Sequence, residues 1–299
     1  MEHLNYNLPA VAGEIRYNVS LSKYSFFGAG GSADVLFMPS DADDLVSFLR
    51  EKPKDLPVTV IGACSNLLIR DGGVRGVVIK LGTWFDNIFI KDDILEVGSA
   101  NSLPKLANKA ADNGLAGLEF LSGIPGSIGG ALVMNAGCYG SCIADVFVEA
   151  EAVDYEGHVH WLNKENVTFE YRHTSLKDLI ITRIWLKCEK SDTSTVAKKM
   201  NELLMKRKSA QAVLYKSCGS AFKNPEGDRK AWQLIDQAGC RGLKVGDAMV
   251  SDTHCNFIVN TGKATATELE ELGEEVRRRV KNAFGIELQW EIIRIGDPL

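Results

Sequence analysis

Short stretches of alternating apolar and polar residues dominate the first two-thirds of the chain, and glycine-rich turns separate them. Alternation with a period of two is typical of strands that bury one face. The pattern predicts strands over residues 33–38, 58–61, 76–81, 87–90, 94–97, 146–153, 158–162 and 180–189.

Helical periodicity appears at only a few places. Residues 42–52 and 102–113 interrupt the strands as amphipathic helices, and the second ends at Gly114, a residue typical of helix ends. A third helix, over residues 193–211, begins where the composition changes. We therefore expect a domain boundary near residue 195.

The best-specified helix covers residues 266–284. Thr265 and Glu268 form a capping box at its start, and apolar residues make one stripe along it. A strand over residues 288–295 follows. The order of elements predicts an α+β fold with mixed sheets rather than repeating βαβ units.

Composition restricts the class of protein. The chain has 299 residues, of which 45% are hydrophobic and 24% charged, and a net charge of −5. This length favours two or three domains, and the charge argues against a nucleic-acid partner. The apolar stretches are shorter than a membrane span needs, and the first twenty residues lack the apolar core of a secretory signal. We expect a cytoplasmic protein without a membrane partner.

Cysteine and histidine do not form a metal-binding pattern. The seven cysteines include no CxxC pair, and the spacing of Cys138 and Cys142 has no second Cys/His pair to complete it. Buried or incidental thiols and no metal site are expected. No Walker lysine, HExxH helix or GxSxG elbow occurs.

Glycine-rich segments are the first candidates for a binding site. Residues 28–33 formally match the dinucleotide fingerprint G-x-G-x-x-A, but a strand follows where that motif requires a helix, so we reject it. Residues 60–68 place a turn of small residues after a strand, and residues 121–137 contain five glycines. Glycine lets backbone amides approach a phosphate or a planar ring closely. Each loop alone is also explained as a turn, but two such loops favour a nucleotide-like cofactor.

Three polar residues stand in contexts typical of a reactive site. Arg172 precedes a strand, Ser220 lies in a turn rich in hydrogen-bond donors, and Glu291 interrupts an apolar strand. By the period of two, Glu291 shares a face with Gln289 and Ile293 and points away from the core. Each residue taken alone is better explained as a surface arginine, a turn serine or an exposed strand carboxylate, because loops and strand edges are usually polar.

The order and spacing of several segments resemble the UDP-N-acetylenolpyruvoylglucosamine reductase (UDP-N-acetylmuramate dehydrogenase) family over nearly the whole chain. The similar segments are residues 62–73, 123–140, 171–172, 219–225, 231–242 and 250–260. Any one of them would be weak evidence. The length is similar to that of the short members, which lack an inserted tyrosine-bearing loop.

The resemblance implies an FAD-binding domain of the p-cresol methylhydroxylase type, with two α/β subdomains, over residues 1–195. A UDP-sugar-binding domain would cover residues 196–287, and the strand over 288–299 would return to the first domain. No histidine lies in residues 61–73, so the FAD is expected to be non-covalent, with Cys64 leaving that question open. The implied cofactor-binding residues are Ile61, Gly62, Ala63, Cys64, Ser65, Asn66, Leu67, Pro125, Gly126, Ser127, Gly129, Gly130, Asn135, Ala136 and Gly137.

The resemblance also implies the chemistry. NADPH would reduce the FAD, which would pass a hydride to the enolpyruvyl group of the UDP-sugar in peptidoglycan synthesis, linked to cell shape and division. Arg172 and Glu291 would stabilise the developing enolate, a form of preorganised electrostatics, and Ser220 would donate the proton. Lys223, Asn224 and Tyr171 would bind the substrate, and the protein would be a monomer.

Two departures from the family pattern affect the site. Cys64 stands where the loop usually has glycine, so a positive φ there would strain it by roughly 1 kcal/mol. Arg172 is followed by His173-Thr174-Ser175, where a serine often comes one residue sooner.

Two other functions compete with this interpretation. An oxidase of the same fold would act on an alcohol or lactone. A non-catalytic protein that binds a flavin or nucleotide sugar would need the glycine loops without all three polar residues.

Overall fold

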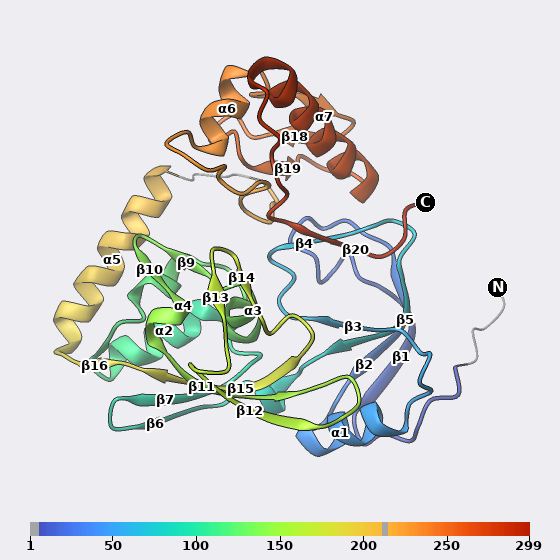
Figure 1. Ribbon diagram of the computed structural model, residues 1–299, viewed down its shortest axis with the longest axis vertical. Coiled ribbons are helices and arrows are strands. Elements are labelled where there is room, and N and C mark those ends of the chain that lie inside the picture. The colour runs from blue at the N-terminus through green and yellow to red at the C-terminus, as the bar shows by residue number, and fades with distance from the viewer. Residues whose placement is uncertain (1–5, 211–214) are drawn as a thin grey trace. The chain divides into compact units, whose positions relative to one another are not determined.

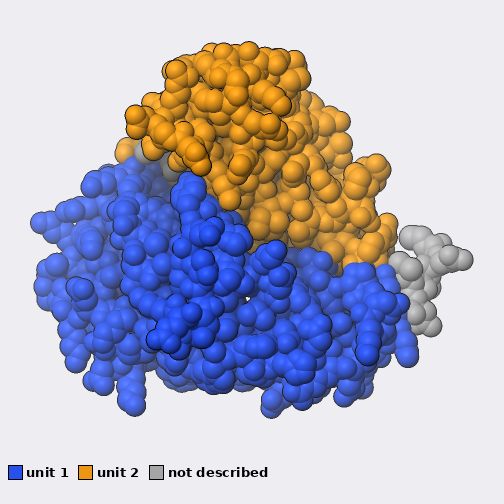
Figure 2. All heavy atoms as spheres, in the orientation of Figure 1, with its two compact units in different colours: residues 1–16, 35–63, 76–207 blue, residues 17–34, 64–75, 208–299 orange. Residues whose placement is uncertain are grey.

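The computed structural model describes residues 6–210 and 215–299, and they form two compact units (Figures 1 and 2). The first unit consists of the chain up to Arg16, Val35–Ala63 and Gly76–Arg207, and the second of Tyr17–Asp34, Cys64–Arg75 and Lys208–Leu299. The predicted boundary at residue 195 lies inside helix α5 (Thr193–Ala210). Two early segments of the chain therefore belong to the same unit as its C-terminal third.

A four-stranded sheet has the order β1 (Glu14–Ser20), β2 (Ser32–Met38), β5 (Val74–Lys80) and β3 (Val58–Ile61). Strand β3 pairs with β5 in parallel, with Val58 opposite Val77. Helix α1 (Ala42–Glu51) buries Leu45, Phe48 and Leu49 in one core with Phe37 and Ile79. Burial of these side chains positions the end of β3, where the first predicted cofactor loop begins.

A second sheet of the first unit is antiparallel throughout. Its order is β12 (Val159–Asn163), β11 (Phe147–Val153), β15 (Ile180–Lys187), β7 (Ile94–Gly98) and β6 (Ile88–Lys91). Helices α2 (Leu103–Asp112), α3 (Ile128–Val133) and α4 (Ile143–Val146) contribute apolar side chains to one core with its strands.

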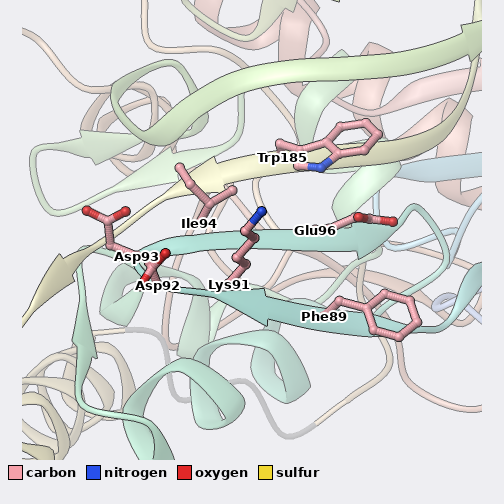
Figure 3. Close-up of a pocket in the computed structure, with 7 residues that line it drawn as sticks. All are labelled: Phe89, Lys91, Asp92, Asp93, Ile94, Glu96 and Trp185. Carbon is pink, nitrogen blue, oxygen red and sulfur yellow. The ribbon is translucent and has the colours of Figure 1, made fainter.

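On β6, β7 and β15 lies a hollow that contains none of the predicted site residues (Figure 3). It is lined by Phe89, Lys91, Asp92, Asp93, Ile94, Glu96 and Trp185.

Short elements complete the first unit. Two 3₁₀ helices cover Thr83–Phe85 and Glu119–Gly123, and β8 (Leu115–Ala116) pairs with β16 (Glu189–Lys190). Two small hairpins are formed by β9 (Gly137–Cys138) with β10 (Ser141–Cys142), and by β13 (Phe169–Glu170) with β14 (His173–Thr174). Both hairpins contribute to the candidate site.

The second unit is built from segments distant in sequence. A three-stranded sheet, β17 (Lys244–Val245), β18 (Ala248–Val250) and β19 (Ile258–Asn260), accompanies helices α6 (Ala231–Gln237) and α7 (Ala266–Phe284). Strand β20 (Ile293–Ile295) pairs in parallel with β4 (Leu67–Ile69). The core joins Phe27 and Leu68, from the early segments, to the apolar stripe of α7.

The backbone N–H groups in the first turn of helix α7 all have hydrogen-bond acceptors. Thr265 and Glu268 form the predicted capping box. Asp71 accepts from the N–H groups of Ala266 and Thr267 at 3.0 and 2.8 Å. A carboxylate at a helix N-terminus also interacts favourably with the helix dipole. Asp71 thereby anchors the segment Cys64–Arg75 to α7.

The α+β prediction is confirmed, and the bounds predicted for Val58–Ile61 and Ala266–Phe284 match the structure. Strand β2 begins at Ser32, which supports the rejection of a dinucleotide fingerprint at residues 28–33. Gln211, the predicted end of α5, lies outside the described residues. Of the predicted C-terminal strand, only Ile293–Ile295 is a strand. The described helices include none with the length and apolar character needed to span a bilayer.

Candidate active site

The first unit brings two of the predicted cofactor loops close together. Residues 61–63 follow the end of β3, and residues 125–130 lead into α3. A Cβ placed on Gly62 would lie 2.5 Å from the Oγ atom of Ser127, closer than real side chains approach. The two loops therefore touch at a point where only glycine fits, and the exposed Gly62 and Gly130 present bare backbone to a ligand.

Backbone hydrogen bonds to the segment after β7 hold the second loop. Leu103 donates its N–H to Gly126 O at 3.0 Å, and Gly129 donates to Ser99 O at 2.9 Å. Ser127 caps α3 by accepting from Gly130 N at 3.4 Å. Among the described residues, the buried Ser99 Oγ and Asn101 Oδ1 atoms have no hydrogen-bond partner.

Buried polar groups without partners are rare, so these two atoms mark a place for a ligand or water. Sequence reasoning missed Ser99 and Asn101. The run of small residues directly after β7 was the available signal.

Asn135 organises the third predicted cofactor segment. Its Nδ2 donates to Glu170 O at 3.0 Å, and its Oδ1 accepts from Ala144 N at 3.1 Å. It has a φ of 42°, a left-handed conformation that Asn adopts more readily than most residues. The side chain of Asn135 thus ties this loop to the hairpin that carries Arg172.

Arg172 is the second residue of a two-residue turn between β13 and β14. It has a φ of 55°, and its guanidinium lies 5.0 Å from the centre of the exposed Tyr171 ring. Its Nη2 donates to Gly137 O at 3.2 Å. The buried Thr174 anchors the hairpin by donating its hydroxyl to Val133 O at 2.9 Å. The structure thus brings together Arg172, Tyr171 and Gly137.

A second arginine, Arg207, lies near Cys138, as Arg172 does. Burial raises the pKa of the Cys138 thiol, while the charges of Arg207 and Arg172 act in the opposite direction. A Cβ on Gly123 would lie 2.7 Å from Cδ of Arg207, which shows how closely this side chain covers the glycine. Arg207 lies in the helix predicted over residues 193–211 and was not among the predicted site residues. Two arginines near one thiol make this part of the unit suited to an anionic ligand.

The remaining cofactor loop, Cys64–Leu67, belongs to the second unit. Cys64 is buried and has a φ of 55°, the conformation for which glycine is preferred. Cys218 donates its Sγ–H to Leu67 O at 3.4 Å, and burial raises the pKa of this thiol to about 12. Strain at a non-glycine residue is typical of functional loops. The expectation that Cys64 occupies a strained position is confirmed.

Ser220 and Glu291 lie on neighbouring segments of the second unit. Ser220 forms an antiparallel bridge with Phe257. The next residue, Ala221, accepts a hydrogen bond from Glu291 N at 2.8 Å. Leu288 and Ile292 are buried while Gln289 and Ile293 are exposed. This alternation agrees with the face expected for Glu291.

The predicted substrate residues Lys223 and Asn224 end the same extended segment. Lys223 donates its N–H to Gln289 O at 2.8 Å. Asn224 Oδ1 accepts from Ala231 N at 3.0 Å, at the first residue of α6. The Oδ1 atom of Asn224 therefore caps the start of α6. Of the three predicted catalytic residues, Arg172 belongs to the first unit and the other two to the second.

The described residues contain no group of three or more His, Cys, Asp or Glu side chains arranged to hold a metal ion.

Comparison with known proteins places these features in one family. Residues 33–163 match the family described as FAD binding domain, and residues 210–295 match the one described as UDP-N-acetylenolpyruvoylglucosamine reductase, C-terminal domain. The reductases of that name from Parvibaculum lavamentivorans and Bradyrhizobium sp. are each 50% identical to this chain. The alignments cover 97% of this chain, and 93% and 94% of those proteins.

A solved structure gives the same result. The crystal structure of UDP-N-acetylenolpyruvylglucosamine reductase from Thermus caldophilus superposes with a TM-score of 0.83 at 36% identity. The match covers 96% of this chain and 100% of that one. The chain therefore belongs to the UDP-N-acetylenolpyruvoylglucosamine reductase family of FAD-containing oxidoreductases.

Proposed function

We propose that the protein reduces UDP-N-acetylglucosamine enolpyruvate to UDP-N-acetylmuramate, with NADPH as the reductant, in the peptidoglycan pathway of the cytoplasm and as a monomer. Family membership supports the reaction. One contact supports the assignment of residues: Glu291 N donates to the O atom of Ala221, the residue after Ser220. The second unit therefore contains both the predicted proton donor and the predicted acid, on neighbouring segments.

The residues of the first unit fit FAD. Gly62 and Gly130 are exposed and have no side chain, so a phosphate or a planar ring can approach both loops closely. The unpartnered Ser99 hydroxyl lies behind the second loop, next to Gly129. Residues 61–63, 125–127, 129–130 and 135–137 of this unit would hold the cofactor, which when bound supplies the hydride that NADPH has delivered.

The remaining chemistry falls to the side chains. Adding a hydride to the terminal carbon of the enolpyruvyl double bond leaves negative charge on the carbon that bears the carboxylate. Arg172 and Glu291 would stabilise that charge, which lowers the barrier when the groups are already in position. Ser220 would donate its hydroxyl proton to the same carbon. Lys223, Asn224 and Tyr171 would orient the UDP-sugar.

Visible absorbance of the purified protein under anaerobic conditions tests the proposal. We expect a yellow protein that NADPH bleaches and that the enolpyruvyl UDP-sugar then recolours. Bleaching without recolouring would retain the flavoprotein and reject the substrate. Rapid reaction with sugar alcohols and oxygen in its place would identify an oxidase.

A further inference from the structure

Asn66 connects the cofactor loop to the backbone of Glu291. The Nδ2 of Asn66 donates to Glu291 O at 3.0 Å. The backbone O of Asn66 accepts from Ile293 N, also at 3.0 Å. Both residues belong to the second unit, although 225 positions separate them in sequence. A residue predicted as a cofactor ligand thus binds the peptide of the predicted acid.

The hydrogen bond from the Asn66 side chain extends a short ladder of parallel strand pairing by one bond. Strands β4 and β20 pair from Leu67 opposite Ile293 to Ile69 opposite Ile295, and Asn66 lies just before this ladder. Glu291 O lies beyond the end of this ladder. The Asn66 side-chain amide donates to this carbonyl. Loss of a partner for a half-buried carbonyl costs more than an average hydrogen bond contributes.

The Glu291 peptide is consequently held from both sides. Its N–H donates to Ala221 O, next to Ser220, at 2.8 Å, and its C=O accepts from Asn66. The first contact fixes the acid relative to the proton donor. The second fixes it relative to the loop Cys64–Leu67, which Cys218 also binds through Leu67 O.

We propose that Asn66 is a positioning residue for Glu291, and that its side-chain hydrogen bond holds the peptide of this acid in place beside the predicted cofactor loop. This inference rests on the proposed function for the role of Glu291. It assigns Asn66 an effect on transfer to the UDP-sugar rather than on cofactor affinity alone. A displacement of about 1 Å at a reacting group can cost about a hundredfold in rate.

Three variants test the inference at saturating FAD, with each half-reaction followed by stopped flow. Asn66→Ala removes the side chain, Asn66→Asp keeps its size but replaces the donor by an acceptor, and Glu291→Gln removes the acid. We expect both Asn66 variants to slow reoxidation by the UDP-sugar by roughly 10–100-fold and to slow bleaching by NADPH much less, with the KM of the UDP-sugar within about twofold of wild type. Asn282→Ala, at an exposed position of α7, is the matched control.

The double variant Asn66→Ala/Glu291→Gln decides the mechanism. If Asn66 acts through Glu291, the double variant is no more than about twofold slower than Glu291→Gln alone, because the two effects do not add. Losses that multiply would overturn the inference. A defect of Asn66→Ala that disappears when more FAD is added would also overturn it, since Asn66 would then be a cofactor ligand only.

Amide hydrogen exchange of the FAD-free protein gives a readout that does not depend on activity. We expect residues 289–293 to exchange about fivefold faster in Asn66→Ala than in wild type, and unchanged in Asn282→Ala. Equal exchange in all three proteins would overturn the inference. A wild-type protein that the UDP-sugar fails to reoxidise would reject the proposed function instead, and the exchange result would still test the contact.

Discussion

Replacing Gly62 by alanine tests whether the two cofactor loops of the first unit must touch. The new Cβ would lie 2.5 Å from Ser127 Oγ and 3.7 Å from Ser127 Cβ. Apart from its chain neighbours, no other described residue comes within 4 Å of it. Gly62 is not among the glycines with positive φ, so alanine causes no backbone strain there. The whole effect of Gly62→Ala on stability should therefore come from the contact with Ser127 Oγ.

The magnitude follows from that contact. To relieve the clash, Ser127 must rotate and lose its 3.4 Å capping bond to Gly130 N, or the loops must separate. Overpacking and the loss of a helix cap each cost on the order of 1–2 kcal/mol. We expect Gly62→Ala to lower the free energy of unfolding by about 2 kcal/mol, a decrease in Tm of roughly 4–8 °C. Weaker retention of FAD should accompany it.

The same Gly62→Ala change made in a Ser127→Ala protein is the matched control. Without the hydroxyl, the closest contact of the new methyl group is 3.7 Å, an ordinary van der Waals distance. In that background Gly62→Ala should be neutral, or stabilising by about 0.5 kcal/mol because alanine restricts the unfolded chain. Thermal and urea unfolding of the four proteins in this cycle measure the coupling. An equal cost in both backgrounds would refute the reasoning, because contact with Ser127 would not be what requires glycine.

Three further outcomes follow from the second unit. Ser220→Ala should leave bleaching by NADPH intact and slow product formation by at least about a hundredfold; normal turnover in a single-turnover assay would remove Ser220 as the proton donor. Asp71→Ala, which deprives α7 of an acceptor for two N–H groups, should lower the free energy of unfolding by about 1–2 kcal/mol in urea, and an unchanged value would contradict the cap.

The hydrogen bond from Arg70 and the charge of Arg294 lower the pKa of Glu270 from 4.5. Its contribution to stability is therefore present above pH 4.5 and is lost as the pH falls through the lowered folded-state pKa. Urea midpoints of wild type should fall more steeply with acid than those of Glu270→Gln, and parallel curves would argue against this pair.

Local patterns predicted much of the fold but little of the site geometry. Helix α7 was fully predictable because its capping box and apolar stripe are both local signals. Strand β1 is largely exposed, and the glycines of α3 lower its helical propensity, so neither had a comparable signal. The left-handed conformations of Asn135 and Arg172 occur just after the end of α3 and in the turn between β13 and β14. Sequence reasoning selected those residues by type and context, and their roles remain predictions.

The long-range pairing of the second unit was the least predictable feature. The strand over residues 288–299 was expected to return to the FAD-binding domain. The part of it that forms a strand, Ile293–Ile295, pairs with Leu67–Ile69, which begins at the last residue of the predicted cofactor loop. That partner segment clusters with the C-terminal third of the chain rather than with its sequence neighbours. The pattern of apolar residues in a segment does not indicate which segment, more than two hundred residues away, will pair with it.

The discontinuity of the second unit has a consequence during synthesis. Ribosomes add about 5–20 residues per second, so the segments ending at Asp34 and Arg75 emerge on the order of 10–50 s before the strand that pairs with β4. During that interval Phe27 and Leu68 lack the core that later buries them. We therefore expect the nascent chain to expose apolar surface for most of its elongation, the kind of surface that chaperones bind. A fragment beginning at Lys208 would conversely lack the cap of α7 and the partner of β20.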